Sequence, residues 1–167
     1  MPLTMSSVAL GSFEQTLGAL SKILDKAAAH CAAKKIDPAV MLATRLTPDM
    51  FPLIRQVQVA CDMAKNGVGR MVGEPPKFPD EEKTFDELKA RIAKTLDYVR
   101  SVKTADIDAA ADKDVTFPVG QQSMTLKGGV FLTSFVLPNF YFHAATAYDI
   151  LRQAGLEIGK RDFLGRA

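Results

Sequence analysis

The side chains best suited to chemistry in this sequence are a histidine in an apolar segment and a group of polar residues far upstream of it. His143 shares a helical stripe with apolar residues, so its imidazole is expected to point inward or into a crevice. There it can act as a ligand, as a general base, or as a core residue bonded to a carbonyl. The sequence does not assign a catalytic role to any residue. The candidates to line a small-molecule pocket are His143, Gln58, Arg55 and Tyr148.

The polar candidates lie beside apolar helical faces. Gln58 follows Ile54 by one helical turn, so its amide can reach a crevice beside the core and either satisfy buried backbone groups or contact a ligand. Arg55 lies close by in the sequence, and Tyr148 can hydrogen-bond near His143 while its ring packs in the core. A purely structural role for each side chain is the alternative.

A divalent metal needs more ligands than this segment supplies. His143 is the one metal-ligand candidate, because Ala147 stands four residues on, where a helical site would place its second ligand. The acidic residues form no Glu-x-x-His pattern, and His30 lies near the end of its helix beside lysines, as a surface residue would. The cofactor is therefore unknown, and a divalent metal would require carboxylates brought in from elsewhere in the chain.

Charge and hydropathy argue against nucleic-acid and membrane partners. The 21 basic and 19 acidic residues leave a net charge of +2, and the basic ones do not gather into a stripe. The most apolar segment, Val130–Leu151, contains Pro138 and Asp149, which lipid disfavours, so a buried helix is expected instead of a membrane span. The first residues lack the pattern of a signal peptide, and Cys31 and Cys61 are expected to be buried free thiols, which together favour the cytoplasm.

Four segments carry the helical spacing of apolar residues, and these helices must position the candidates. They cover about residues 10–31, 50–71, 85–99 and 130–153. Residues 115–126 are predicted to form a small hairpin or extended flap before the last helix. The sequence therefore predicts an all-α protein, one domain over residues 1–167, built as a four-helix bundle with a small irregular or hairpin insertion.

Local signals predict how the helices begin and bend. Thr47-Pro48-Asp49 is typical of a cap at the start of the second helix, and Thr84 with Glu87 forms a capping box at the start of the third. In the third helix, Arg91 falls on the outer, solvent-facing side. In the last helix, Pro138 is expected to introduce a kink.

Several motifs along the whole chain resemble a bacterial family known as a domain of unknown function (number 1993). They are the segments Leu46–Pro52, Arg55–Gln58, Asn139–His143, Ala147–Arg152 and Gly159–Gly165. That family is similar to the DinB-like (YfiT-like) superfamily of predicted metalloenzymes. The resemblance implies a left-handed four-helix bundle with its helices running up-down-down-up, frequently as a dimer.

The resemblance also implies where a metal site would lie. In metal-binding DinB-like proteins one histidine from the second helix and two from the fourth, four residues apart, converge on the metal. Here His143 matches one member of the fourth-helix pair, Ala147 replaces the other, and Gln56 or Gln58 stands near the position of the second-helix ligand.

Three functions are compatible with these residues. The first is an enzyme or small-molecule binder that uses a DinB-like site around His143, which predicts a polar pocket there and a perturbed imidazole. The second is a non-catalytic structural or interaction protein, a homodimer through the last helix, because that helix is apolar on nearly every side. The third is a metal-dependent enzyme of the DinB-like kind.

Overall fold

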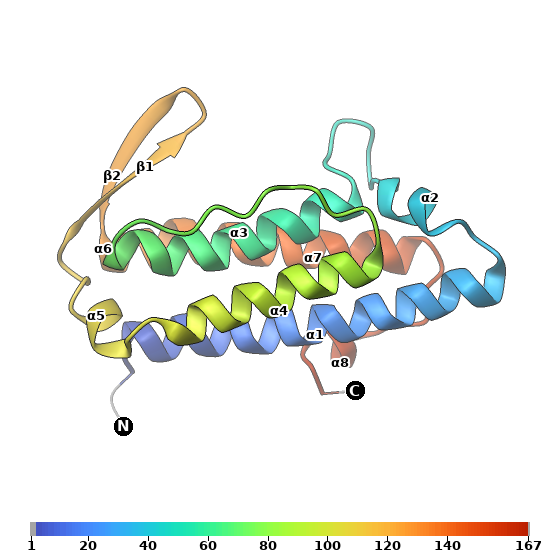
Figure 1. Cartoon of the computed structure of the whole chain (residues 1–167), viewed down its shortest axis with the longest axis horizontal. Coiled ribbons are helices and arrows are strands. Elements are labelled where there is room, and N and C mark those ends of the chain that lie inside the picture. The colour runs from blue at the N-terminus through green and yellow to red at the C-terminus, as the bar shows by residue number, and fades with distance from the viewer. Residues whose placement is uncertain (1–2, 167) are drawn as a thin grey trace.

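Four long helices lie side by side and form the body of the protein (Figure 1). The computed structural model describes residues 3–166. The long helices are α1 (Met5–Lys34), α3 (Leu53–Val72), α4 (Phe85–Ser101) and α7 (Leu137–Gln153). The short elements are α2 (Pro38–Ala43), α5 (Thr104–Asp108), β1 (Asp114–Val119), β2 (Gln122–Lys127), α6 (Gly128–Val130), the π-helical η1 (Phe131–Val136) and α8 (Lys160–Phe163). In Figure 1, α1 and α7 run in one direction, whereas α3 and α4 run in the other.

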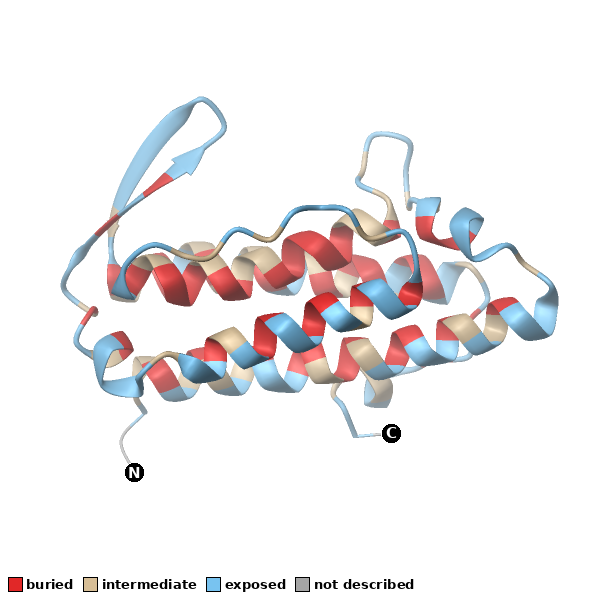
Figure 2. Ribbon diagram, in the orientation of Figure 1, coloured by how far each residue is buried: buried red, intermediate tan, exposed pale blue. Residues whose placement is uncertain are grey.

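The four inner faces meet in a continuous apolar core, and α3 is its most buried long helix (Figure 2). Phe13 of α1 packs edge-on against Phe140 of α7, with their ring centroids 4.9 Å apart. Cys31 and Cys61 are buried free thiols, as predicted. Within residues 3–166, no helix combines the length and the apolar character that crossing a bilayer requires.

A two-stranded antiparallel sheet corrects the expectation of a purely all-α protein. Strands β1 and β2 pair from Asp114 opposite Lys127 to Val119 opposite Gln122, and Gly120 takes a positive φ of 60° in the tight turn between them. The hairpin predicted before the last helix is therefore present. Phe117 anchors it, because its ring lies 4.7 Å from that of Phe131 in η1.

The second long helix begins later than predicted. Thr47-Pro48-Asp49 belongs to a loop, and α3 begins at Leu53 with Pro52 at its N-cap position. A proline disfavours helical backbone in the residue before it, so the helix cannot extend back through Phe51. The Leu53 N–H donates instead to the carbonyl of Thr44, at 2.9 Å, which holds the loop against the end of α3.

The predicted kink before Pro138 takes the form of a π-helical segment. In η1 the helix widens, and the Leu137 N–H donates to the carbonyl of Leu132, five residues earlier. Proline cannot donate a backbone N–H, and such wider turns let the helix pass through it without a break. The Asn139 side chain donates to the carbonyl of Phe135 at 2.7 Å and caps the distorted turn.

Helix α4 confirms one prediction and contradicts another. Thr84 and Glu87 form the predicted capping box at its first turn. Arg91, however, is not on the solvent-facing side, because only 3% of this residue is exposed. The segment between α3 and α4 runs back along α3 (Figure 1), and its Pro79 carbonyl accepts from the guanidinium at 2.9 Å.

Candidate functional site

His143 is held in one orientation by a short chain of hydrogen bonds. The Gln56 side-chain amide donates through Nε2 to the carbonyl of Phe51, at 3.0 Å. Its other end, Oε1, therefore faces His143 and lies 2.7 Å from Nδ1 of the imidazole. Since an amide oxygen can only accept, Nδ1 carries the proton and donates it. The remaining ring nitrogen, Nε2, then keeps its lone pair and has no hydrogen-bond partner within residues 3–166.

The half-buried imidazole lines a small crevice between the start of α3, α7 and the loop before α3. The crevice has a volume of about 190 Å³ and is lined by Asp49, Met50, Phe51, Gln56, Phe142 and His143. Two aromatic rings frame the imidazole: Phe51 stacks on it with centroids 6.5 Å apart, and Phe142 meets it edge-on at 5.2 Å. The site thus combines apolar walls with one exposed acceptor.

The electrostatic surroundings keep the imidazole neutral. Burial lowers the pKa of His143 below its usual range, and the positive charge of nearby Arg55 lowers it further. A neutral imidazole at pH 7 can accept a hydrogen bond or take a proton as a general base.

None of the other pocket candidates lines the crevice, and Arg55 donates to the amide oxygen of Gln58 at 3.4 Å. Arg55 lies at the rim of the crevice, with its guanidinium 5.8 Å from the centre of the Phe51 ring and paired with Asp80. Gln58 points to the opposite side of α3 and donates to Glu82 at 2.9 Å, because residues two apart on a helix face nearly opposite ways. Tyr148 packs edge-on against Phe163 of α8, at 5.8 Å, and does not line the crevice.

The structure brings residues to His143 that sequence reasoning did not select for the pocket. The resemblance to the DinB-like superfamily offers Gln56 and Gln58 as alternatives near the position of the second-helix ligand. Residues two apart face nearly opposite sides of a helix, so helical spacing could have distinguished between them. Met50 and Phe51 reach the imidazole from the loop before α3, and no local pattern marks such a contact. Phe142 is adjacent to His143 in sequence, and nothing in an apolar helix distinguishes a ring that lines a crevice from one that packs in the core.

The polar group on the other side of α3 is an ionic network around buried Arg91. Its Nη2 lies 2.9 Å from Asp62 and 2.9 Å from Asp80, and its Nη1 lies 3.0 Å from Glu82. Nη1 also donates to the carbonyl of Pro79 at 2.9 Å. The network links α4 to α3 and to the connecting segment 73–84. Its role is therefore to stabilise the packing of these three parts of the chain.

The residues around His143 do not fit a divalent metal. Catalytic zinc takes several protein ligands, whereas residues 3–166 contain no group of three or more His, Cys, Asp or Glu side chains placed to hold an ion. The Gln56 oxygen is already used by Nδ1. Asp49 is exposed and accepts a hydrogen bond from Thr47 at 2.7 Å. The chemistry of this site therefore rests on the imidazole.

Comparison with known proteins identifies the family of this chain. The family model described as Domain of unknown function (DUF1993) matches residues 5–164. A DinB family member protein from Shewanella denitrificans, solved by crystallography, is 44% identical and superposes with a TM-score of 0.89, over 96% of this chain and 91% of that one. No functionally curated protein is significantly similar. This chain belongs to the family described as Domain of unknown function (DUF1993), which lies within the wider DinB family.

Proposed function

We propose that this protein binds a small, flat organic molecule in the crevice of His143. The observation that carries the proposal is the hydrogen-bond chain from the Phe51 carbonyl through Gln56 to His143, which presents Nε2 as an acceptor. This acceptor is open to the crevice and is not a buried unpaired atom, so a ligand that donates a hydroxyl or N–H group can reach it beside apolar walls.

The walls define the rest of the ligand. Phe51 and Phe142 offer aromatic surfaces, which favour a planar apolar body. The volume of about 190 Å³ lies below the roughly 300–1,000 Å³ of drug-sized sites, so the crevice takes a small molecule or one end of a larger one. If the protein acts on its ligand, the neutral imidazole serves as the base that removes the donated proton.

Phenol is expected to bind this crevice more tightly than toluene, which has the same ring but no donor. The hydrogen bond to Nε2 should favour phenol by about three- to tenfold, or roughly 0.7–1.4 kcal/mol. Titrations followed by the imidazole ¹⁵N resonances measure both the binding and the nitrogen involved. Because the pKa of His143 is lowered, the preference should hold at pH 7 and disappear only as the pH falls below the ordinary imidazole range.

His143→Phe is the matched variant, since it keeps an aromatic ring and removes the acceptor. It should bind phenol no more tightly than toluene, because the phenol hydroxyl then leaves water without gaining a partner. The proposal is contradicted if the unaltered protein binds the two probes equally. It is also contradicted if phenol shifts the ¹⁵N resonance of Nδ1 in place of that of Nε2.

A homodimer through α7 is the second candidate, favoured by the apolar surface beside the same crevice. Phe142 is 55% exposed and Phe51 is 50% exposed, and Tyr141 is exposed next to them. Large exposed aromatic residues that gather at one place are typical of interfaces. Light scattering after size exclusion is expected to show a dimer that Phe142→Glu converts to a monomer, while Val40→Glu, an exposed apolar site on α2, leaves it intact. A monomeric parent protein at about 50 µM argues against this candidate, because such interfaces hold at micromolar Kd.

The remaining expectations from the sequence stay proposals as well. The directions of the long helices and the similarity to the DinB family member support a left-handed bundle with up-down-down-up order. A metal-dependent activity requires stoichiometric metal in the purified protein and its loss in His143→Ala. A cytoplasmic location rests on the composition and the N-terminal sequence alone.

A further inference from the structure

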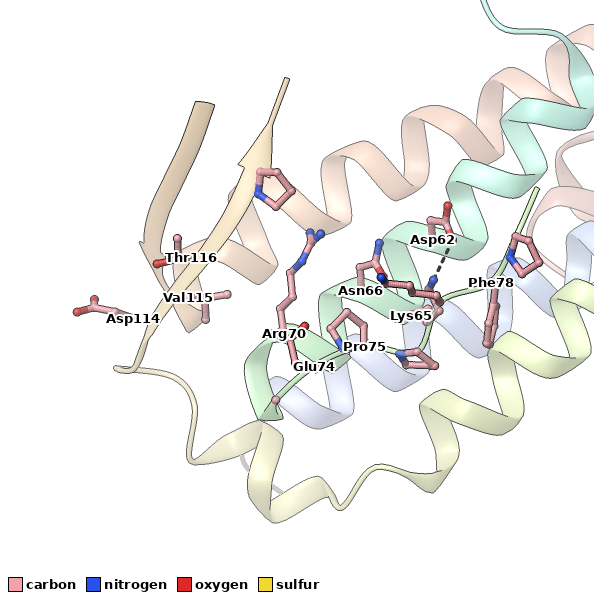
Figure 3. A pocket seen from close by; sticks show the side chains of 15 residues that line it. Asp62, Lys65, Asn66, Arg70, Glu74, Pro75, Phe78, Asp114, Val115 and Thr116 are labelled. Atoms are coloured by element: carbon pink, nitrogen blue, oxygen red, sulfur yellow. Dashed lines mark ion pairs between the residues drawn. The ribbon is translucent and has the colours of Figure 1, made fainter. Parts of the chain in front are cut away.

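A second and larger cavity lies at the other end of α3, away from His143. It has a volume of about 820 Å³ and opens between the second half of α3, the proline-rich segment 73–79 and strand β1 (Figure 3). Gln56 and Arg70 are 14 positions apart on α3, so at about 1.5 Å per residue the two cavities are roughly 20 Å apart along the helix axis. This volume falls within the roughly 300–1,000 Å³ that small-molecule sites occupy.

Arg70 stands inside this cavity with its charge unpaired. In Figure 3 its side chain rises from α3 into the space between the helix and β1. Its guanidinium makes no hydrogen bond and no ion pair with any residue from 3 to 166, although the residue is half-buried. Burial lowers the pKa of Arg70, whereas the charges of Glu74 and Asp62, which lie beyond ion-pair distance, act against that. Arg70 lies in the last turn of α3, where the helix dipole favours a positive charge. No hydrogen bond from its N–H groups to a residue from 3 to 166 is formed there.

Other donors face the same space. Asn66 lies one helical turn before Arg70, lines the cavity, and its amide makes no side-chain hydrogen bond within the described residues. The Lys65 ammonium, in a residue only 4% exposed, is held 3.2 Å from Asp62 and 4.6 Å from the centre of the Phe78 ring. Asp62 is itself occupied by Lys65 and by Arg91, at 2.9 Å.

The acidic side chain on the hairpin does not oppose an anion in the cavity. The carboxylate of Asp114 points away from the cavity in Figure 3 and pairs with Lys127 at 2.7 Å. Val115 of β1, Pro75 and Phe78 supply apolar walls. The cavity therefore combines unsatisfied donors with apolar surface.

We propose that this cavity binds a small organic carboxylate, which accepts from Arg70 and Asn66 and rests its apolar body against the proline-rich segment and β1. A guanidinium matches the two oxygens of a carboxylate with parallel hydrogen bonds. Arg70 and the exposed Lys77 both line the cavity without an ion pair to any residue from 3 to 166, and Glu74 offsets one of these two charges, so the positive charge that remains balances a singly charged acid. A carboxylate therefore fits better than a phosphate.

Benzoate, benzamide and inorganic phosphate test the proposal by calorimetry and by backbone amide shifts. Benzoate should bind and shift the amides of α3 around Arg70, benzamide should bind at least about tenfold more weakly, and phosphate should be weaker than benzoate. Arg70→Met should weaken benzoate by at least about tenfold, and Arg70→Lys should restore part of the affinity, because an ammonium keeps the charge without the planar fork.

Matched controls separate this site from general charge effects and from the His143 crevice. Arg100→Met removes an exposed arginine that pairs with Glu14, and His143→Phe alters the other cavity, so neither should change benzoate binding. Arg70→Met should also fold with an unchanged or higher melting temperature, because it removes an unpaired half-buried charge. The proposal is overturned if benzamide or phosphate binds as well as benzoate, if Arg70→Met binds normally, if it melts markedly lower, or if the shifted amides lie elsewhere.

Discussion

Arg91→Met is expected to lower the free energy of unfolding by about 2–4 kcal/mol, since removing one partner of a buried ionic group leaves the others uncompensated. Asp62, Asp80 and Glu82 converge on this guanidinium and would face one another without it. The carbonyl of Pro79 would lose its donor as well. The expected loss is smaller than for a fully buried pair because the carboxylates keep some contact with water. Urea denaturation followed by circular dichroism measures the effect.

Lys89→Met is the matched control on the same helix. Lys89 pairs with Asp25 and Asp86, whose side chains are largely exposed, so its loss should destabilise the protein far less than the loss of Arg91. Equal losses for the two variants would mean that the Arg91 network contributes no more than a surface ion pair. Arg91 holds segment 73–84 through Asp80, Glu82 and Pro79. The Arg91→Met variant should therefore also expose that segment to proteolysis before the rest of the chain unfolds.

Gly69→Ala is expected to destabilise the protein by about 1–3 kcal/mol, although alanine favours a helix, because overpacking a close contact costs more than propensity returns. A Cβ at this position would lie 2.6 Å from Cβ and 2.8 Å from Cα of Pro75, and 2.8 Å from the Tyr98 hydroxyl. The chain segment after α3 would have to move away from the helix. Thermal unfolding compared with the parent protein gives the size of the change.

Gly18→Ala on α1 is the corresponding control. Nothing lies within 4 Å of the added Cβ there, so the substitution should be neutral or stabilise by up to about 1 kcal/mol. Since Pro75 also forms a wall of the larger cavity, Gly69→Ala should shift backbone amide resonances on both sides of that cavity. A Gly69→Ala protein as stable as Gly18→Ala would show that segment 73–79 is not packed as closely as described.

The elements of this fold follow mainly from signals within short stretches of sequence. The apolar stripes predicted the four long helices, Thr84 and Glu87 predicted the start of α4, and the loss of helical spacing predicted the hairpin. These signals are readable because capping hydrogen bonds and helical spacing join residues only three or four positions apart. The later start of α3 was within reach too, since Pro52 restricts the residue before it.

Which polar groups meet depends on the packing of the helices and their connections. The helical spacing of apolar residues places His143 on the inner side of its helix, but it does not predict that Gln56 orients the imidazole while Gln58 faces Glu82. Arg91 was placed on an exposed face because its own helix contains nothing that covers it. Its partners come from Asp62 on α3 and from segment 73–84, which meet α4 only in the folded chain. Contacts between distant segments depend on how the connecting segments pack on the helices. The spacing of residues within one helix does not predict that packing.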